Sequence, residues 1–159
     1  MPEKRRFFLE NKDFFSASAF QHQIFYSRKI GIYNGYSVPI IAGIRLTGNS
    51  NNFQYGLINV QTNRMNDLNL EAQNFSVVRL IKYFSENNSY IGGIFTNKNS
   101  TESFSYNRVV GIDGKYFFND EIATNFFVSK SFNYNSINSQ NNSFGIAVSK
   151  YQKNGYILN

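Results

Sequence analysis

The stretch RVVGIDGKYFF, residues 108–118, decides the fold class because its side chains alternate in character. One set of alternate positions is mostly apolar: Val110, Ile112, Gly114, Tyr116 and Phe118. The other set contains two charged residues, Asp113 and Lys115. A period of two places successive side chains on opposite faces of a β-strand. Because a charge is costly in a dry core, we expect the face of Asp113 and Lys115 to meet water.

Three further stretches, at residues 38–47, 122–129 and 143–149, repeat this alternation. Their predicted apolar faces are Val38, Ile40, Ala42, Ile44 and Leu46 in the first, Ile122, Thr124, Phe126 and Val128 in the second, and Phe144, Ile146 and Val148 in the third. The opposite faces carry mainly small or polar residues, with Arg45 and Asn125 among them. Each stretch therefore predicts a strand with one apolar face.

Four other segments are predicted strands whose facing the pattern does not decide: 20–31, 53–62, 75–85 and 89–98. Short polar turns and longer loops rich in Asn and Ser separate the strands. Consecutive strands with such links favour an antiparallel up-and-down meander. We therefore predict an all-β chain, with an entry segment at 1–19 and about eight strands within 20–159.

The composition excludes several classes of protein. The chain has 159 residues and no cysteine, which rules out disulfides, thiolate metal sites and a cysteine nucleophile. Aromatic residues make up 18% of the chain, and no apolar run approaches the ~20 residues of a transmembrane helix. The formal net charge is +6, but the basic residues are scattered, so no nucleic-acid partner is predicted.

No catalytic or metal-binding pattern stands out in the sequence. His22 is the single histidine, and no cluster of His, Asp and Glu has the spacing of metal ligands. Glu10 and Asp13 are a close pair of carboxylates, which we interpret as part of a salt-bridged loop. The glycine-containing stretches lack the Lys-Ser/Thr of a phosphate loop. We predict a protein without enzymatic activity or cofactor.

Two architectures fit a meander with one apolar face. In an outer-membrane β-barrel that face meets lipid, and the polar face lines the lumen. Arg45, Asp113, Lys115 and Asn125 would then be lumen-facing, and Tyr36, Tyr83, Tyr90 and Tyr151 would resemble an aromatic girdle. In a soluble barrel or sandwich, which would bind a carbohydrate or a lipid, the apolar face packs inward. The first architecture is our prediction, and the second is its alternative.

Two motifs near the start of the chain carry a family resemblance. They are RFFLE at residues 6–10 and FYSRKIG at residues 25–31, followed by the strand end RLTG at 45–48. Over residues 3–150, this series resembles an uncharacterised family of C-terminal β-barrel domains in Gram-negative outer-membrane proteins. Those domains follow a carbohydrate-binding family-nine-like domain. Lys29 and Arg45 each replace one cation of the family pattern with another.

The resemblance implies an outer-membrane location, a lipid bilayer as partner and a glycan-binding domain ahead of the barrel. It also implies that the chain is an incomplete barrel, in which Phe7, Phe8, Phe14 and Phe15 fill apolar gaps near the mouth. The matching motif residues are Arg6, Phe7, Phe8, Glu10, Tyr26, Arg28 and Gly31. The resemblance leads us to expect a structural role for these residues. For the domain as a whole, it leads us to expect anchoring, together with either solute passage or a glycan-related role.

Overall fold

The computed structural model describes residues 30–84, 89–134 and 141–150, together with Phe15, Ser18–Ala19 and His22–Gln23. The large sheet consists of β5 (Ile40–Ser50), β6 (Phe53–Thr62), β7 (Gln73–Phe84), β8 (Ser89–Ser100), β9 (Tyr106–Phe117), β10 (Ile122–Asn133) and β11 (Asn142–Lys150). Two small sheets pair β1 (Ser18–Ala19) with β2 (His22–Gln23) and β3 (Ile32–Tyr33) with β4 (Tyr36–Ser37). One turn of 3₁₀-helix, η3 (Asn66–Leu68), lies between β6 and β7.

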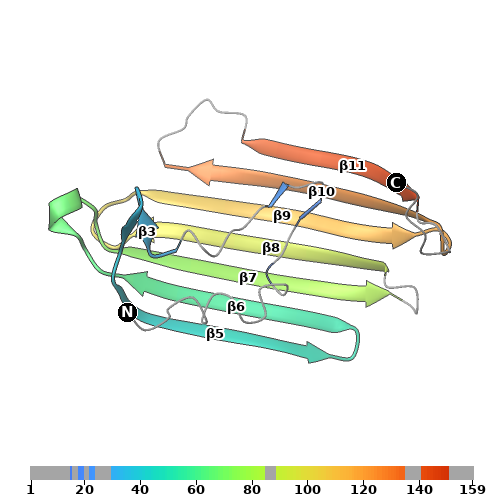
Figure 1. The fold of residues 1–159 in the computed structure, drawn as a ribbon, viewed down its shortest axis with the longest axis horizontal. Helices are drawn as coiled ribbons and strands as arrows, with labels where there is room; N and C mark the ends of the chain where they lie inside the picture. The colour runs from blue at the N-terminus through green and yellow to red at the C-terminus, as the bar shows by residue number, and fades with distance from the viewer. Residues whose placement is uncertain are drawn as a thin grey trace, which may run out of the picture.

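The large sheet is an antiparallel up-and-down meander, as predicted. Its strands pair in chain order from β5 to β11 (Figure 1). The sheet is not closed into a barrel, since β5 and β11 form its two edges. Of the predicted strand at 20–31, His22–Gln23 pairs with β1 in a separate sheet and does not join the meander. The large sheet therefore has seven strands.

The connections differ at the two ends of the sheet (Figure 1). Residues 51–52, 85–88 and 118–121 link strands at one end, which we call the short-turn end. Residues 63–72, 101–105 and 134–141 link them at the other, the long-loop end. At the short-turn end, Asn119 accepts hydrogen bonds on its side-chain oxygen from the backbone N–H groups of Glu121 and Ile122. These bonds stabilise the turn between β9 and β10.

Cross-strand register assigns every strand residue to one of two faces. One row across the sheet is Leu46, Leu57, Val78, Phe95 and Val110. The next row is Thr47, Gly56, Arg79, Ile94 and Gly111, on the opposite face. We call the face of the first row the outer face and that of the second row the inner face. The faces predicted for 108–118, 122–129 and 143–149 are confirmed by this register.

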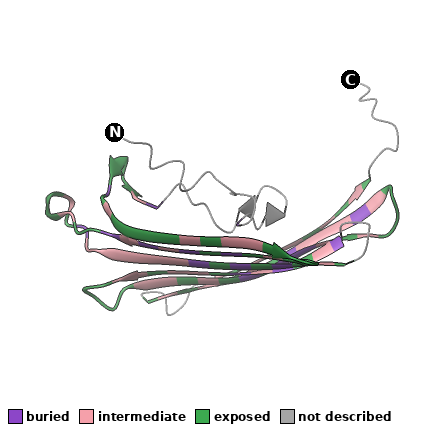
Figure 2. Ribbon diagram, turned by 90° about the horizontal axis from the view of Figure 1, so that it is seen from below, coloured by how far each residue is buried: buried purple, intermediate pink, exposed green. Residues whose placement is uncertain are grey.

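The dry core lies against the inner face. Its buried cluster consists of Phe15, Ile30, Ile58, Val60, Val77 and Ile94. Phe15 and Ile30 precede the large sheet in the chain, and β1 lies against β10. Figure 2 shows the sheet as a curved band, with the β3–β4 hairpin on one side of it. Apolar residues from the N-terminal part of the chain therefore cover part of the inner face.

The start of β5 departs from the predicted facing. Ile40 pairs with Thr62 and Ala42 pairs with Gln61, so the register shifts across Ile41. A bulge of this kind adds one residue to a strand. The residues before it therefore point to the opposite face of the sheet from the one that an unbroken alternation predicts. Ile40 consequently packs against the core cluster, while Ile41 is 62% exposed. The prediction that Val38 and Ile40 share a face with Ile44 and Leu46 was wrong.

Two glycines before β5 occupy left-handed conformations. Asn34 and Gly35 have φ angles of 48° and 84°, which is the type I′ turn that an Asn-Gly pair favours between strands. Gly31 has a φ angle of 77°, and its carbonyl oxygen accepts a hydrogen bond of 2.8 Å from the Val38 N–H. Any other L-residue at Gly31 would be strained. Gly31 thus has a structural reason to be glycine.

Gly56 provides the space that Phe15 occupies, which leads to a first prediction. A Cβ atom at Gly56 would lie 2.7 Å from Cε1 of Phe15, whose side chain is only 4% exposed. Overpacking a well-packed site costs typically ~1–3 kcal/mol, so Gly56→Ala should lower the free energy of unfolding by about that amount. Denaturant unfolding measures the change. The matched control is Gly93→Ala, because no atom lies within 4 Å of a Cβ there. Equal losses in the two variants would contradict the packing.

Candidate functional site

The outer face of the large sheet presents large apolar side chains to the surroundings. They lie on all seven strands, and we call them the apolar band: Ile44, Leu46, Phe53, Tyr55, Leu57, Val78, Leu80, Phe84, Ile91, Phe95, Val110, Ile112, Tyr116, Val128, Phe132, Phe144, Ile146 and Val148. Their exposed fractions run from 38% at Leu57 to 81% at Phe144. Figure 2 shows exposed stretches on the strands of the sheet, with fewer buried ones among them.

The size of the apolar band sets it apart from ordinary protein surface. It contains the aromatic residues Phe53, Tyr55, Phe84, Phe95, Tyr116, Phe132 and Phe144. A fully buried aromatic side chain buries ~150–250 Å². Multiplied by the exposed fractions, this area gives on the order of 600 Å² of exposed surface from these seven side chains alone. The largest apolar patch on a typical soluble monomer is about 300–600 Å² in total. The outer face therefore exceeds that range once its aliphatic residues are added.

Hydrogen-bonded amides border the apolar band toward the long-loop end. The Asn59 amide donates to Asn74 at 3.0 Å and to Ser76 at 2.8 Å, and the Asn74 amide donates to Gln61 at 3.2 Å. Further along the same border, Arg108 donates to Asn97 at 3.1 Å. These residues occupy outer-face positions of β6 to β9.

Three of the four tyrosines expected to form an aromatic girdle are described, and none of them lies on the outer face. Tyr83 and Tyr90 are cross-strand partners on the inner face, with ring centroids 5.9 Å apart. The Tyr83 hydroxyl donates to Gln54 at 3.0 Å, which holds it on that face. Tyr36 belongs to the β3–β4 hairpin, and Tyr151 lies outside the described residues. On the outer face, other aromatic residues lie near the strand ends, such as Phe53, Phe84 and Tyr116 at the short-turn end and Phe132 near the long-loop end.

The inner face contains a buried ion pair. Arg79 on β7 donates two hydrogen bonds to the Asp113 carboxylate on β9, at 2.5 and 2.8 Å, and both side chains are 1% exposed. Gly92 on β8 makes room between them, since a Cβ there would lie 2.7 Å from the guanidinium nitrogens. The Tyr90 hydroxyl lies 3.4 Å from the same carboxylate. The expectation that Asp113 meets water was wrong, because Arg79 neutralises its charge in a dry site.

The four candidate lumen residues share the inner face. Arg45 pairs in register with Ile58, and Lys115 pairs with both Tyr90 and Asn125. The Lys115 ammonium lies 4.5 Å from the centre of the Phe117 ring, and the Asn125 amide donates to Ser149 at 3.3 Å. That they face a lumen stays a prediction. Of the motif residues, Arg6, Phe7, Phe8, Glu10, Tyr26 and Arg28 lie outside the described residues.

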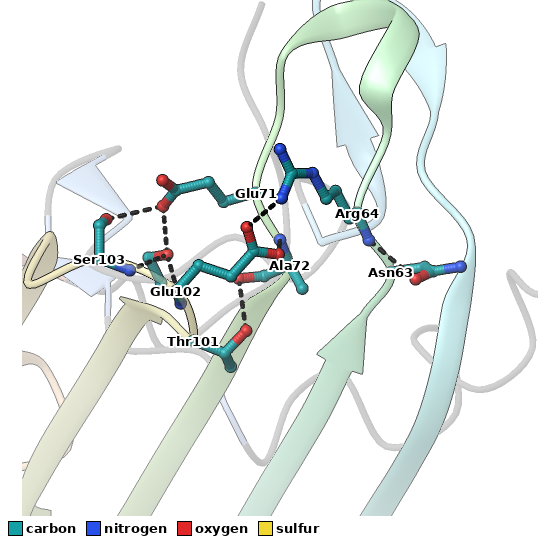
Figure 3. Close-up of polar contacts among 8 residues, drawn as sticks. Asn63, Arg64, Glu71, Ala72, Thr101, Glu102 and Ser103 are labelled. Atoms are coloured by element: carbon teal, nitrogen blue, oxygen red, sulfur yellow. Dashed lines mark hydrogen bonds and ion pairs between the residues drawn. The ribbon is translucent and has the colours of Figure 1, made fainter.

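Polar contacts join the loops at the long-loop end (Figure 3). Glu71, before β7, accepts hydrogen bonds from the hydroxyls of Ser100 and Ser103, and these bonds lower the pKa of its carboxyl. Arg64 forms an exposed ion pair of 2.7 Å with Glu102. The backbone N–H of Thr101 also donates to the Ala72 carbonyl at 3.0 Å. The 63–72 and 101–105 loops are thereby tied to each other.

The described residues offer little for catalysis or metal binding. They contain no group of three or more His, Cys, Asp and Glu side chains placed to hold a metal ion. A polar recess of about 240 Å³ lies at the long-loop end, lined by Gln73, Lys98, Ser100, Ser105, Tyr106, Asn107, Asn133 and Tyr134. Ligand pockets usually measure ~300–1,000 Å³, so this recess is small for one. Within the same residues, no helix has the length and apolar character needed to span a bilayer.

Comparisons with protein-family models, with curated proteins and with solved structures give no match for this chain.

Proposed function

We propose that this chain is a non-catalytic segment of an outer-membrane β-barrel, and that its apolar band anchors it in the lipid bilayer. The exposed band carries the proposal. Apolar surface in water costs about 25 cal/mol per Å², so the seven aromatic rings alone would cost on the order of 15 kcal/mol. That is as large as the upper end of the net stability of a typical domain, ~5–15 kcal/mol. Contact with acyl chains removes this cost.

Strand length and loop asymmetry support the same proposal. The strands of the large sheet have between 9 residues, in β11, and 12 residues, in β7 to β10. A tilted strand needs ~9–11 residues to cross the hydrocarbon layer. Outer-membrane barrels also connect strands by short turns on the periplasmic side and by longer loops outside the cell. The short-turn and long-loop ends of this sheet follow that division.

The filled inner face favours anchoring over solute passage. Phe15 and Ile30 are buried against Ile58 and Val77 on this face, where a channel would need water. The Arg79–Asp113 pair is equally dry. The family resemblance adds the further proposal that a glycan-binding domain precedes the barrel and acts at the cell surface. The alternative, a soluble β-protein, would require another surface to cover the apolar band.

Lipid contact can be tested directly because the chain contains no tryptophan. A single tryptophan replaces either Phe95, on the outer face, or Phe75, which packs against the core cluster on the inner face. Both variants are folded into vesicles whose acyl chains carry bromine, a quencher of indole fluorescence. We expect strong quenching of Phe95→Trp and little quenching of Phe75→Trp. Equal quenching, or a chain that stays monomeric in buffer without lipid or detergent, would contradict the proposal.

A further inference from the structure

The charged residues of the outer face are all basic. In the described strands, its charged side chains are Lys82, Arg108, Lys130 and Lys150, and each of them is exposed. The only carboxylate within these strands, Asp113, lies on the inner face and is paired with Arg79. The outer face therefore carries four positive charges and no negative charge among its described strand positions.

These cations lie toward the ends of their strands, among the outermost aromatic residues of the apolar band. Lys82 is near the end of β7 and Lys150 is the last residue of β11, so both belong to the short-turn end. Arg108 is near the start of β9 and Lys130 near the end of β10, at the long-loop end. The middle of the face, around Leu80, Ile112 and Val128, is uncharged. This distribution matches a bilayer, in which charge is tolerated at the two interfaces and costly between them.

Aromatic rings hold three of the four cations at these positions. The Lys82 ammonium lies 5.4 Å from the centre of the Phe53 ring and 5.6 Å from that of Phe84. The Arg108 guanidinium lies 4.5 Å from the Tyr106 ring, and the Lys130 ammonium 5.4 Å from the Phe132 ring. Such an arrangement is typical of membrane interfaces. The apolar stem of a long basic side chain lies along the apolar surface, and its charged head lies at the border of that surface.

We propose that these four residues form two basic rims that bind the phosphate groups of anionic lipids on both sides of the apolar band. This inference rests on the proposed function and adds lipid selectivity to it. Lipid phosphates are the anions that both rims would meet at once if the band lies in the bilayer. Carboxylates near the rims belong to loops, and two of them are engaged there: Glu102 with Arg64, and Glu71 with Ser100 and Ser103.

Partition of the folded chain between detergent micelles and lipid vesicles tests the inference. Vesicles of phosphatidylcholine alone are compared with vesicles that also contain phosphatidylglycerol. A basic residue near an anionic surface contributes a factor of roughly five in binding, so we expect the native chain to prefer the anionic vesicles more than tenfold. Each of Lys82→Gln, Arg108→Gln, Lys130→Gln and Lys150→Gln should reduce the preference by up to about fivefold. Salt should weaken it.

Lys98→Gln is the matched control, because Lys98 is an inner-face lysine whose ammonium lies 5.7 Å from the Phe75 ring. It removes the same charge without touching a rim, and the lipid preference should not change. Equal partition of the native chain into both vesicles would overturn the basic rims while leaving the proposed lipid contact intact. An equal loss in Lys98→Gln and the rim variants would also overturn them, since net charge would then explain the preference. Absence of partition into either vesicle would refute both proposals.

Discussion

Replacing Ile112 with arginine should destabilise the folded chain in a bilayer by about 2–4 kcal/mol, a factor of roughly thirty to nearly a thousand in the folding equilibrium. Ile112 is 45% exposed in the middle of the outer face, with Gly93 and Val128 as its cross-strand partners. If this face met water, an arginine there would be a surface substitution worth no more than about 0.5 kcal/mol. The two environments thus predict effects of very different size for one substitution.

Denaturant unfolding from lipid vesicles measures the effect of Ile112→Arg. The matched control is Asn142→Arg, which introduces the same side chain on the same face at the start of β11, where the strand meets the long-loop end. Near an interface the cost of arginine falls to about 0–1 kcal/mol. Similar losses at the two positions would mean that depth in a bilayer does not govern the outer face, and the apolar band would need another explanation.

The sequence predicts facing where the two faces of a strand differ in chemistry. In residues 108–118 and 143–149, one face is mostly apolar and the other is mostly small, polar or charged, and the register confirms both assignments. In 53–62 and 75–85 both faces carry apolar residues. Their inner-face members, such as Ile58 and Val77, are covered by Phe15 and Ile30 from a distant part of the chain. No local pattern contains that information.

Two further features were missed for identifiable reasons. The bulge lies at Ile41, where two consecutive isoleucines interrupt the alternation, but the prediction treated residues 38–47 as one regular strand. The partner of Asp113 is Arg79, which is 34 positions away in a segment of undecided facing. The glycine pair at 92–93 between them was a usable signal. A glycine in the middle of a strand often marks a place where another group approaches closely, and at Gly92 that group is the Arg79 guanidinium.

Removing the Asp113 carboxylate should cost about 3–5 kcal/mol of unfolding free energy, because it leaves the Arg79 guanidinium buried without a counter-charge. The pair is 1% exposed on both sides, so water cannot take the place of the lost carboxylate. Asp113→Ala measures this cost by denaturant unfolding. The exposed pair of Arg64 and Glu102 is the matched control, since it has a similar distance of 2.7 Å but side chains that are 54% and 33% exposed. Glu102→Ala should cost about 0–1 kcal/mol.

The double variant Arg79→Met with Asp113→Ala separates the charge effect from packing. Replacing a buried ion pair by apolar residues is often neutral or stabilising, so the double variant should be more stable than Asp113→Ala alone. If Asp113→Ala and Glu102→Ala shift the unfolding midpoint equally, the inner face is wet. The pair would then be a lumen feature in contact with water, and the inner face would not be filled. The double variant could instead lose more unfolding free energy than Asp113→Ala. In that case the two side chains contribute mainly through their shape complementarity around Gly92.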